Sequence, residues 1–219
     1  MPRVRIALAV ALAAALAVPA ALACGRGYSY AGLYAPRPAS GVAATLSMLD
    51  QPSVSSGHAA AWVGVGGPHL GPRDTDEWLQ VGIASFPGSA QGRLYYEVTQ
   101  PGREPQYHEL APAIEPHERV RVAVFELPFA PDAWVVISDK GVAGPFYLPK
   151  SHRAWAPIAT AESWDDGRAA CNRYAYRFGG VQLQHRAGSW KPLRHGMKLQ
   201  DPGLRVQRTE TSTFSVIAD

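Results

Sequence analysis

The chain is divided into ten short runs rich in Val, Ile, Tyr, Phe and Trp, each bounded by Gly, Pro or Asp. Runs of this length, separated by turn-forming residues, are typical of β-strands joined by short connections. No segment shows a convincing helical periodicity of apolar residues. We therefore predict an all-β fold, a two-sheet antiparallel β-sandwich. The expected strands span residues 42–49, 59–66, 77–84, 92–99, 119–127, 133–138, 144–148, 158–164, 174–184 and 213–218.

The connections between these runs indicate one domain. The 21 Gly and 19 Pro residues are scattered along the chain rather than gathered in a linker. Asp139-Lys140-Gly141 is expected to form a tight hairpin turn. We expect the polar segment 186–211 to consist of loops, and segment 24–55 to hold the first strands rather than a pro-segment. The prediction is a single domain over residues 24–219.

The first 23 residues have the pattern of an export signal. Arg3 and Arg5 precede an apolar run, which is followed by Pro19 and the small-residue triplet Ala21-Leu22-Ala23. The apolar run is almost long enough to be an uncleaved membrane anchor, but the proline and the triplet favour cleavage. We predict a signal peptide over residues 1–23 and a secreted, extracytoplasmic protein that begins at Cys24.

Cys24 has two possible fates. A cysteine directly after a signal peptide can be lipidated, which would tether the protein to a membrane surface. The preceding triplet lacks the leucine expected three residues before a lipidated cysteine. We favour a disulfide between Cys24 and Cys171, because an oxidising compartment permits it and it uses both thiols of the chain.

Charge and motifs exclude several functions. The formal net charge of +3 falls to +1 when Arg3 and Arg5 are removed, which leaves no electrostatic footprint for nucleic acid. The chain lacks a Gly-x-Ser-x-Gly elbow, a His-Glu-x-x-His motif and a phosphate-binding glycine loop. We predict no cofactor and a monomeric state. The seven histidines show no metal-ligand spacing, so we expect no metal and place most of them in loops or on the surface: His58, His69, His108, His117, His152, His185 and His195.

Two predicted strands each place a polar residue on the same face as a tryptophan. Alternate residues of a strand share a face, so Gln80 lies with Trp78, and Glu162 lies with Thr160 and Trp164. A carboxylate can take a proton from water as the water attacks a peptide carbonyl, and can then return it to the leaving amine. A carboxamide can donate N–H to the oxyanion that forms. Glu162 and Gln80 are therefore candidate catalytic residues.

The run Ala61-Trp62-Val63-Gly64-Val65-Gly66, then Leu79-Gln80-Val81-Gly82, and a distant Ala161-Glu162 followed by Trp164, resembles the glutamic peptidase family, the eqolisins. The resemblance covers about residues 55–185. It implies a secreted acid endopeptidase with a concanavalin-like β-sandwich that hydrolyses peptide or protein substrates with a Gln/Glu dyad. It also implies Glu162 as general base and then acid, Gln80 as oxyanion stabiliser, and Trp62 as part of the substrate groove.

The chain departs from the family pattern at two positions. Family members usually carry an aspartate where this chain has Gly66. They also carry a Glu-Trp doublet where this chain has Glu162-Ser163-Trp164, so Trp164 falls on the face of Glu162 rather than on the opposite one. The first change removes an acidic group from the expected site.

Other interpretations of the same residues remain. A sheet face lined with Trp78, Trp164 and Tyr95 is expected to contact substrate, but such a face also suits a non-catalytic secreted module that binds carbohydrate or extended peptide. Gln80 can be a solvent-facing strand residue, and Glu162 can pair with Arg173 or Arg177. Trp62, Trp78, Trp155 and Trp164 can simply pack in a core. A third possibility is an intact dyad whose groove is blocked by the loops 68–76 or 101–107.

Overall fold

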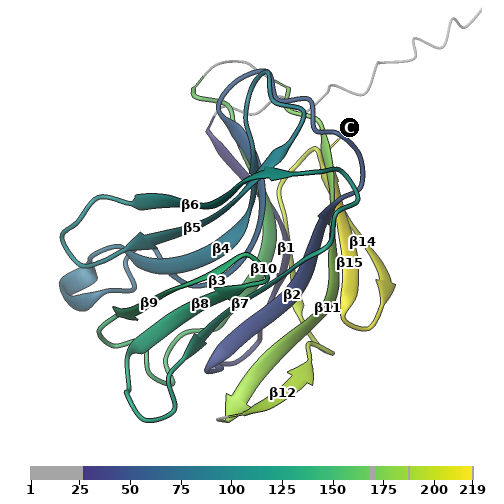
Figure 1. Ribbon diagram of the computed structural model, residues 1–219. Coiled ribbons are helices and arrows are strands. Elements are labelled where there is room, and N and C mark those ends of the chain that lie inside the picture. Colours follow the sequence, from purple (N-terminus) through teal and green to yellow (C-terminus); the bar gives the residue numbers. More distant parts are fainter. Residues whose placement is uncertain (1–26, 168–170, 187, 219) are drawn as a thin grey trace, which may run out of the picture.

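The computed structural model describes residues 27–167, 171–186 and 188–218, and it consists of two antiparallel sheets that lie face to face (Figure 1). The predicted β-sandwich is therefore confirmed. The first sheet contains, in spatial order, β13 (Met197–Gln200), β1 (Tyr28–Tyr34), β10 (Ile158–Trp164), β3 (His58–Gly67), β4 (Glu77–Ser85), β5 (Gly92–Thr99) and β6 (Gln106–Ile114). The second contains β14 (Leu204–Glu210), β15 (Thr213–Ala218), β11 (Tyr174–Arg186), β2 (Gly41–Met48), β7 (Val120–Glu126), β8 (Ala133–Ser138) and β9 (Gly141–Tyr147), with β12 (Ser189–Pro192) paired to β11.

The core lies between the sheets and follows from the alternation of side chains along each strand. On β4, for example, Leu79, Val81 and Ile83 are completely buried between the sheets. The second sheet contributes the largest buried side chains, among them Trp134, Tyr176, Phe178 and Phe214. Burial of one such apolar side chain stabilises the fold by about 1.5–3 kcal/mol. The intervening residues of β4 point away from the core, onto the face that carries the candidate site.

All ten expected strands are present, and those at 92–99, 133–138, 158–164 and 213–218 have the predicted bounds. Asp139 and Lys140 form the predicted turn between β8 and β9. The segment before residue 55 contains β1 and β2, as expected. The prediction that 186–211 consists of loops was wrong, because β12, β13 and β14 lie there.

Five strands were not among the ten expected ones; β1 lies inside the first sheet, whereas β6, β12, β13 and β14 lie at sheet edges or are short and polar. β6 is the edge strand of the first sheet, carries Pro112 and is largely exposed, so it lacks an apolar face that a pattern could reveal. β13 and β14 form the opposite edges of the two sheets and are also mostly exposed. Backbone pairing with a neighbouring strand, rather than burial of side chains, defines these elements.

The predicted signal peptide and Cys24 lie outside the described residues. The proposed cleavage, the lipidation alternative and the Cys24–Cys171 disulfide therefore stay predictions, although Cys171 is not a free thiol. Within the described ranges, no helix has the length and apolar character needed to cross a membrane.

Candidate active site

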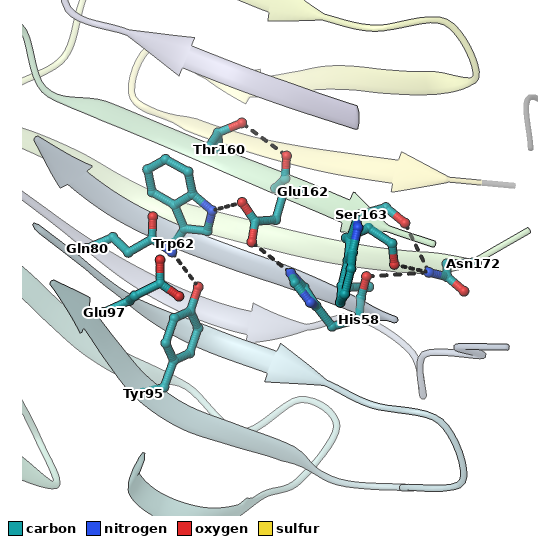
Figure 2. A network of polar contacts seen from close by, with 12 residues as sticks. His58, Trp62, Gln80, Tyr95, Glu97, Thr160, Glu162, Ser163 and Asn172 are labelled. Carbon is teal, nitrogen blue, oxygen red and sulfur yellow. Dashed lines mark hydrogen bonds and ion pairs between the residues drawn. The ribbon is translucent and has the colours of Figure 1, made fainter. Parts of the chain in front are cut away.

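The candidate residues lie on the face of the first sheet that points away from the second sheet, which we call the open face. β3 runs between β10 and β4, and its register places Ala60 opposite Glu162 and Gly64 opposite Gln80. The predicted strand faces are thus correct: Gln80 and Glu162 both project onto the open face, and Figure 2 shows them with Trp62 between them in that view. Trp62 itself is half-buried.

The carboxylate of Glu162 is held by two side chains of β3. Its Oε2 accepts a hydrogen bond from the indole Nε1–H of Trp62 at 2.9 Å, and its Oε1 lies 3.0 Å from Nε2 of His58 (Figure 2). Only 6% of Glu162 is exposed, so these contacts replace most of its hydration. The Glu162 carboxylate is therefore held in one position by the protein rather than freely solvated.

The suggested ion pair of Glu162 with Arg173 or Arg177 was wrong. Arg177 belongs to β11 of the second sheet, and Arg173, just before β11, pairs through its backbone with Ser53. The strands that flank Glu162 are instead β1 and β3. The sequence did not reveal which strands would be neighbours.

His58 is the main residue of the site that was not predicted from the sequence, in which the spacing of the histidines indicated loop or surface positions for most of them. It is the first residue of β3, and its ring is surrounded by Trp164, Tyr28 and Phe86 at centroid distances of 5.6, 6.2 and 6.2 Å. A signal was available: His58 precedes Trp62 by four residues, so both share a strand face.

The loop residue Asn172 ties the ends of β3 and β10 together beneath this contact. Its Nδ2 donates hydrogen bonds to the carbonyl oxygens of His58 and Trp164 at 3.4 and 3.2 Å and to Oγ of Ser163 at 3.1 Å. Asn172 is itself buried. The relative placement of His58 and Glu162 is therefore supported by a buried polar network, part of which Figure 2 shows.

Gln80 is held on its other side by Tyr95. The carboxamide Nε2–H donates to the Tyr95 hydroxyl at 3.1 Å, and Gln80 is 7% exposed. Tyr95 is 2% exposed and its ring stacks on Tyr107 at 5.0 Å. Burial raises the pKa of Tyr95 well above its usual value, so its hydroxyl stays protonated. Tyr95, predicted to contact substrate, instead orients Gln80 from within the protein.

A second carboxyl group, Glu97, lies directly opposite Gln80 on β5. Its Oε1 accepts a hydrogen bond from the Trp78 indole Nε1–H at 2.9 Å. Burial raises the pKa of Glu97, the Trp78 hydrogen bond opposes this, and the charge of Glu162 adds to the rise. Trp78, predicted to line a groove, thus donates a hydrogen bond to Glu97, the residue opposite Gln80.

Two glycines keep the space around Trp62 free of other side chains. Gly64 lies across from Gln80, and Gly82 lies across from Trp62. An added Cβ at Gly82 would lie 2.2 Å from the Ala61 carbonyl oxygen, so this position does not accept a larger residue. The register of β3 places Gln80 and Glu162 diagonally across that strand. Gln80 contacts Tyr95, Glu162 contacts Trp62 and His58, and no hydrogen bond joins Gln80 to Glu162 in the described part of the chain.

The family difference at Gly66 has a backbone explanation. Gly66 has a φ of 85°, a backbone conformation that residues other than glycine rarely adopt. An added Cβ would lie 2.2 Å from the carbonyl oxygen of Glu77 and 2.8 Å from Cα of Trp78. An aspartate therefore does not fit this backbone, and the open face lacks that acid for a structural reason.

Aromatic side chains continue the open face beyond Glu162. Tyr28 stacks on Trp164 at a centroid distance of 5.9 Å and on Tyr30 at the same distance, and 54% of Tyr28 is exposed. Trp164 therefore belongs to a partly exposed aromatic row, and its contact with substrate stays a prediction. Trp155, in contrast, is in the core, which confirms its packing interpretation. Among the described residues, no three His, Cys, Asp or Glu side chains are grouped as metal ligands would be.

The fold is similar to that of two peptidases of known structure. Scytalido-glutamic peptidase, solved with a transition state analog inhibitor, is 17% identical with a TM-score of 0.57, and the match covers 89% of this chain and 98% of that one. SCP-B, a member of the eqolisin family of peptidases solved with the tripeptide Ala-Ile-His, is 15% identical with a TM-score of 0.55 and the same coverage. No protein-family model and no curated protein sequence matches the chain. At these identities the relationship is one of fold.

Proposed function

We propose that this protein is a secreted endopeptidase that uses Glu162 and Gln80. The observation that carries the proposal is the Glu162 carboxylate, held between Trp62 and His58 on the same sheet face as Gln80. The fold shared with two peptidases supports the class of reaction, and the aromatic row beside Glu162 supports a peptide as substrate.

Glu162 acts first as a general base. Each of its oxygens accepts one hydrogen bond from the protein, and a carboxylate has about four acceptor positions, so both oxygens can still bind a water. Glu162 removes a proton from this water as the water oxygen bonds to the peptide carbonyl carbon. The carbonyl π electrons move onto its oxygen, which becomes an oxyanion.

Gln80 stabilises the oxyanion. Its carboxamide has two N–H groups, and Tyr95 accepts from Nε2. The other N–H is available to the oxyanion, and the Tyr95 contact orients it without a charged group. When the tetrahedral intermediate breaks down, the oxyanion electrons re-form the carbonyl, the C–N bond breaks, and the proton on Glu162 moves to the leaving amine. The net reaction consumes one water and needs no cofactor.

A non-catalytic module is the second candidate, and the exposed Tyr28–Trp164 stack favours it. Aromatic rings on a sheet face bind the faces of sugar rings or extended peptides without any chemistry. A binding module has no need for a buried, doubly held carboxylate, which is why we place it second.

The test is cleavage of a mixed peptide library by the purified protein between pH 2.5 and 8, read by mass spectrometry. Glu162→Gln and Gln80→Ala should abolish cleavage while circular dichroism shows an unchanged fold. Glu109→Gln is the matched control, because Glu109 lies on the same sheet in an exposed ion pair with Arg93. Absence of cleavage by the wild type at every pH, or full activity in either dyad variant, would refute the peptidase assignment.

A further inference from the structure

The outer face of the second sheet, opposite to the open face, contains a pocket of about 580 Å³ lined by three arginines, Arg119, Arg121 and Arg177. We propose that this pocket binds a phosphate or sulfate group, either as the free ion or as an ester on a small molecule. The site is separate from the candidate active site, because the whole sandwich core lies between them.

The strand register brings the arginines together. Arg121 on β7 lies opposite Thr45 on β2, and Arg177 on β11 lies opposite Ser47 on the same strand. Arg119 directly precedes Val120, the partner of Leu46, and so lies beside Ser47 on the other side of β2. Arg119 and Arg177 therefore flank Ser47 from opposite sides. Arg121 lies two residues further along β7, beside Thr45. Side chains at such positions are neighbours across the sheet.

None of the three guanidinium groups has a hydrogen bond or ion pair with a described residue. The nearby acids are engaged elsewhere: Asp139 accepts the backbone N–H of Arg121 at 2.7 Å, and Glu118 pairs with Lys140 at 3.0 Å. Glu210 also lines the pocket, where its Oε2 accepts from Oγ1 of Thr213 at 3.3 Å. Three neighbouring positive charges repel one another, and a bound anion with two charges relieves that repulsion.

The rest of the lining suits a tetrahedral oxyanion and leaves room for it. Ala43, Gly179 and Gly180 line the pocket without bulky side chains, and an added Cβ at Gly180 would meet no atom within 4 Å. Thr45, Ser47 and Ser212 supply hydroxyl donors. The planar guanidinium group of arginine binds phosphate oxygens through pairs of parallel hydrogen bonds, a geometry that the ammonium group of lysine cannot provide. The volume exceeds that of a bare ion, so an ester such as a sugar phosphate also fits.

The experiment is titration calorimetry of the purified protein with inorganic phosphate, sulfate and chloride at one ionic strength, and with glucose 6-phosphate and glucose. We expect saturable binding of phosphate and sulfate but not of chloride or glucose. Tighter binding of glucose 6-phosphate than of phosphate would identify an ester as the preferred source, and the reverse order would identify the free ion.

Arg121→Gln and Arg177→Gln should each weaken phosphate binding at least 10-fold. Arg103→Gln makes the same charge change in the loop between β5 and β6, outside the pocket, and should leave the affinity unchanged. Circular dichroism checks that the variants are folded. No saturable binding of either oxyanion, or an equal loss of affinity in Arg103→Gln, would overturn the proposal, since the second result would mean that net charge alone attracts the ion.

Discussion

Nε2 of His58 lies 3.0 Å from Oε1 of Glu162, across two neighbouring strands of the first sheet. The two side chains are 20% and 8% exposed, so solvent screens the contact only weakly. His58 also opposes the rise that burial causes in the pKa of Glu97, and its ring packs edge-on against Tyr28.

His58 is predicted to hold the Glu162 carboxylate in place for the proposed reaction. His58→Phe keeps an aromatic ring but removes the contact of Nε2 with Oε1 of Glu162 at 3.0 Å, so kcat should fall by roughly 10-fold or more. His58→Gln can still donate a hydrogen bond and should therefore lose less kcat than His58→Phe. Equal kcat in the wild type and both variants would show that the contact does not position the base.

The Trp62 indole is predicted to hold Glu162 through a single hydrogen bond. Trp62→Phe removes the N–H that donates to Oε2 but keeps an aromatic ring. Hydrogen bonds to charged groups contribute about 1.5–3 kcal/mol, so kcat should fall by roughly 10- to 100-fold. Trp78→Phe is the comparison, because it removes an equivalent N–H bond to Glu97 rather than to Glu162. Equal losses in the two variants would argue against a specific role for Trp62.

Gly66 is predicted to tolerate no side chain. Gly66→Asp places a Cβ against the Glu77 carbonyl at a positive φ, and the loss of stability should be about 2 kcal/mol or more. Gly67→Ala is the control, since its added Cβ would meet only Leu70 Cδ1 at 3.6 Å. Urea denaturation of the two variants gives the free energies of unfolding. A Gly66→Asp protein as stable as Gly67→Ala would contradict the steric explanation.

Glu77 is predicted to make the fold less stable as the pH rises. Glu77 is completely buried, both of its carboxyl oxygens lack a partner among the described residues, and burial raises its pKa from 4.5 to about 7. Asp132 adds to this rise and Lys150 opposes it. The folded state therefore binds more protons than the unfolded state between these pH values, and the free energy of unfolding falls from about pH 4.5 to 7.

Glu77→Gln removes this penalty without a change of shape. At pH 4, where the carboxyl group is neutral, the variant and the wild type should have similar stability. At pH 8 the variant should be more stable, by up to about 3 kcal/mol. Urea denaturation at both pH values measures the difference. If the difference in free energy of unfolding between Glu77→Gln and the wild type is the same at pH 8 as at pH 4, Glu77 is ionised in the folded state at no cost.

Strand periodicity predicted which residues share a face, and this part of the site was correct. Gln80 and Glu162 lie on the same face of one sheet because side chains alternate along an extended backbone whatever surrounds it. The contacts of those residues were not predictable in the same way. Tyr95 was expected to contact substrate, but it accepts a hydrogen bond from Gln80 in the interior. It is buried because the ring of Tyr107, on the edge strand β6, stacks against it.

The sequence by itself determined the fold class, ten of the strands and the faces of the two candidate residues, because these depend on local spacing of apolar and turn-forming residues. Only the tertiary structure decided which strands became neighbours. That choice put His58 and Trp62, rather than Arg173 or Arg177, beside Glu162, and it gathered Arg119, Arg121 and Arg177 on the opposite side of the molecule. Strand order arises from packing between segments far apart in the chain, and no local pattern records it.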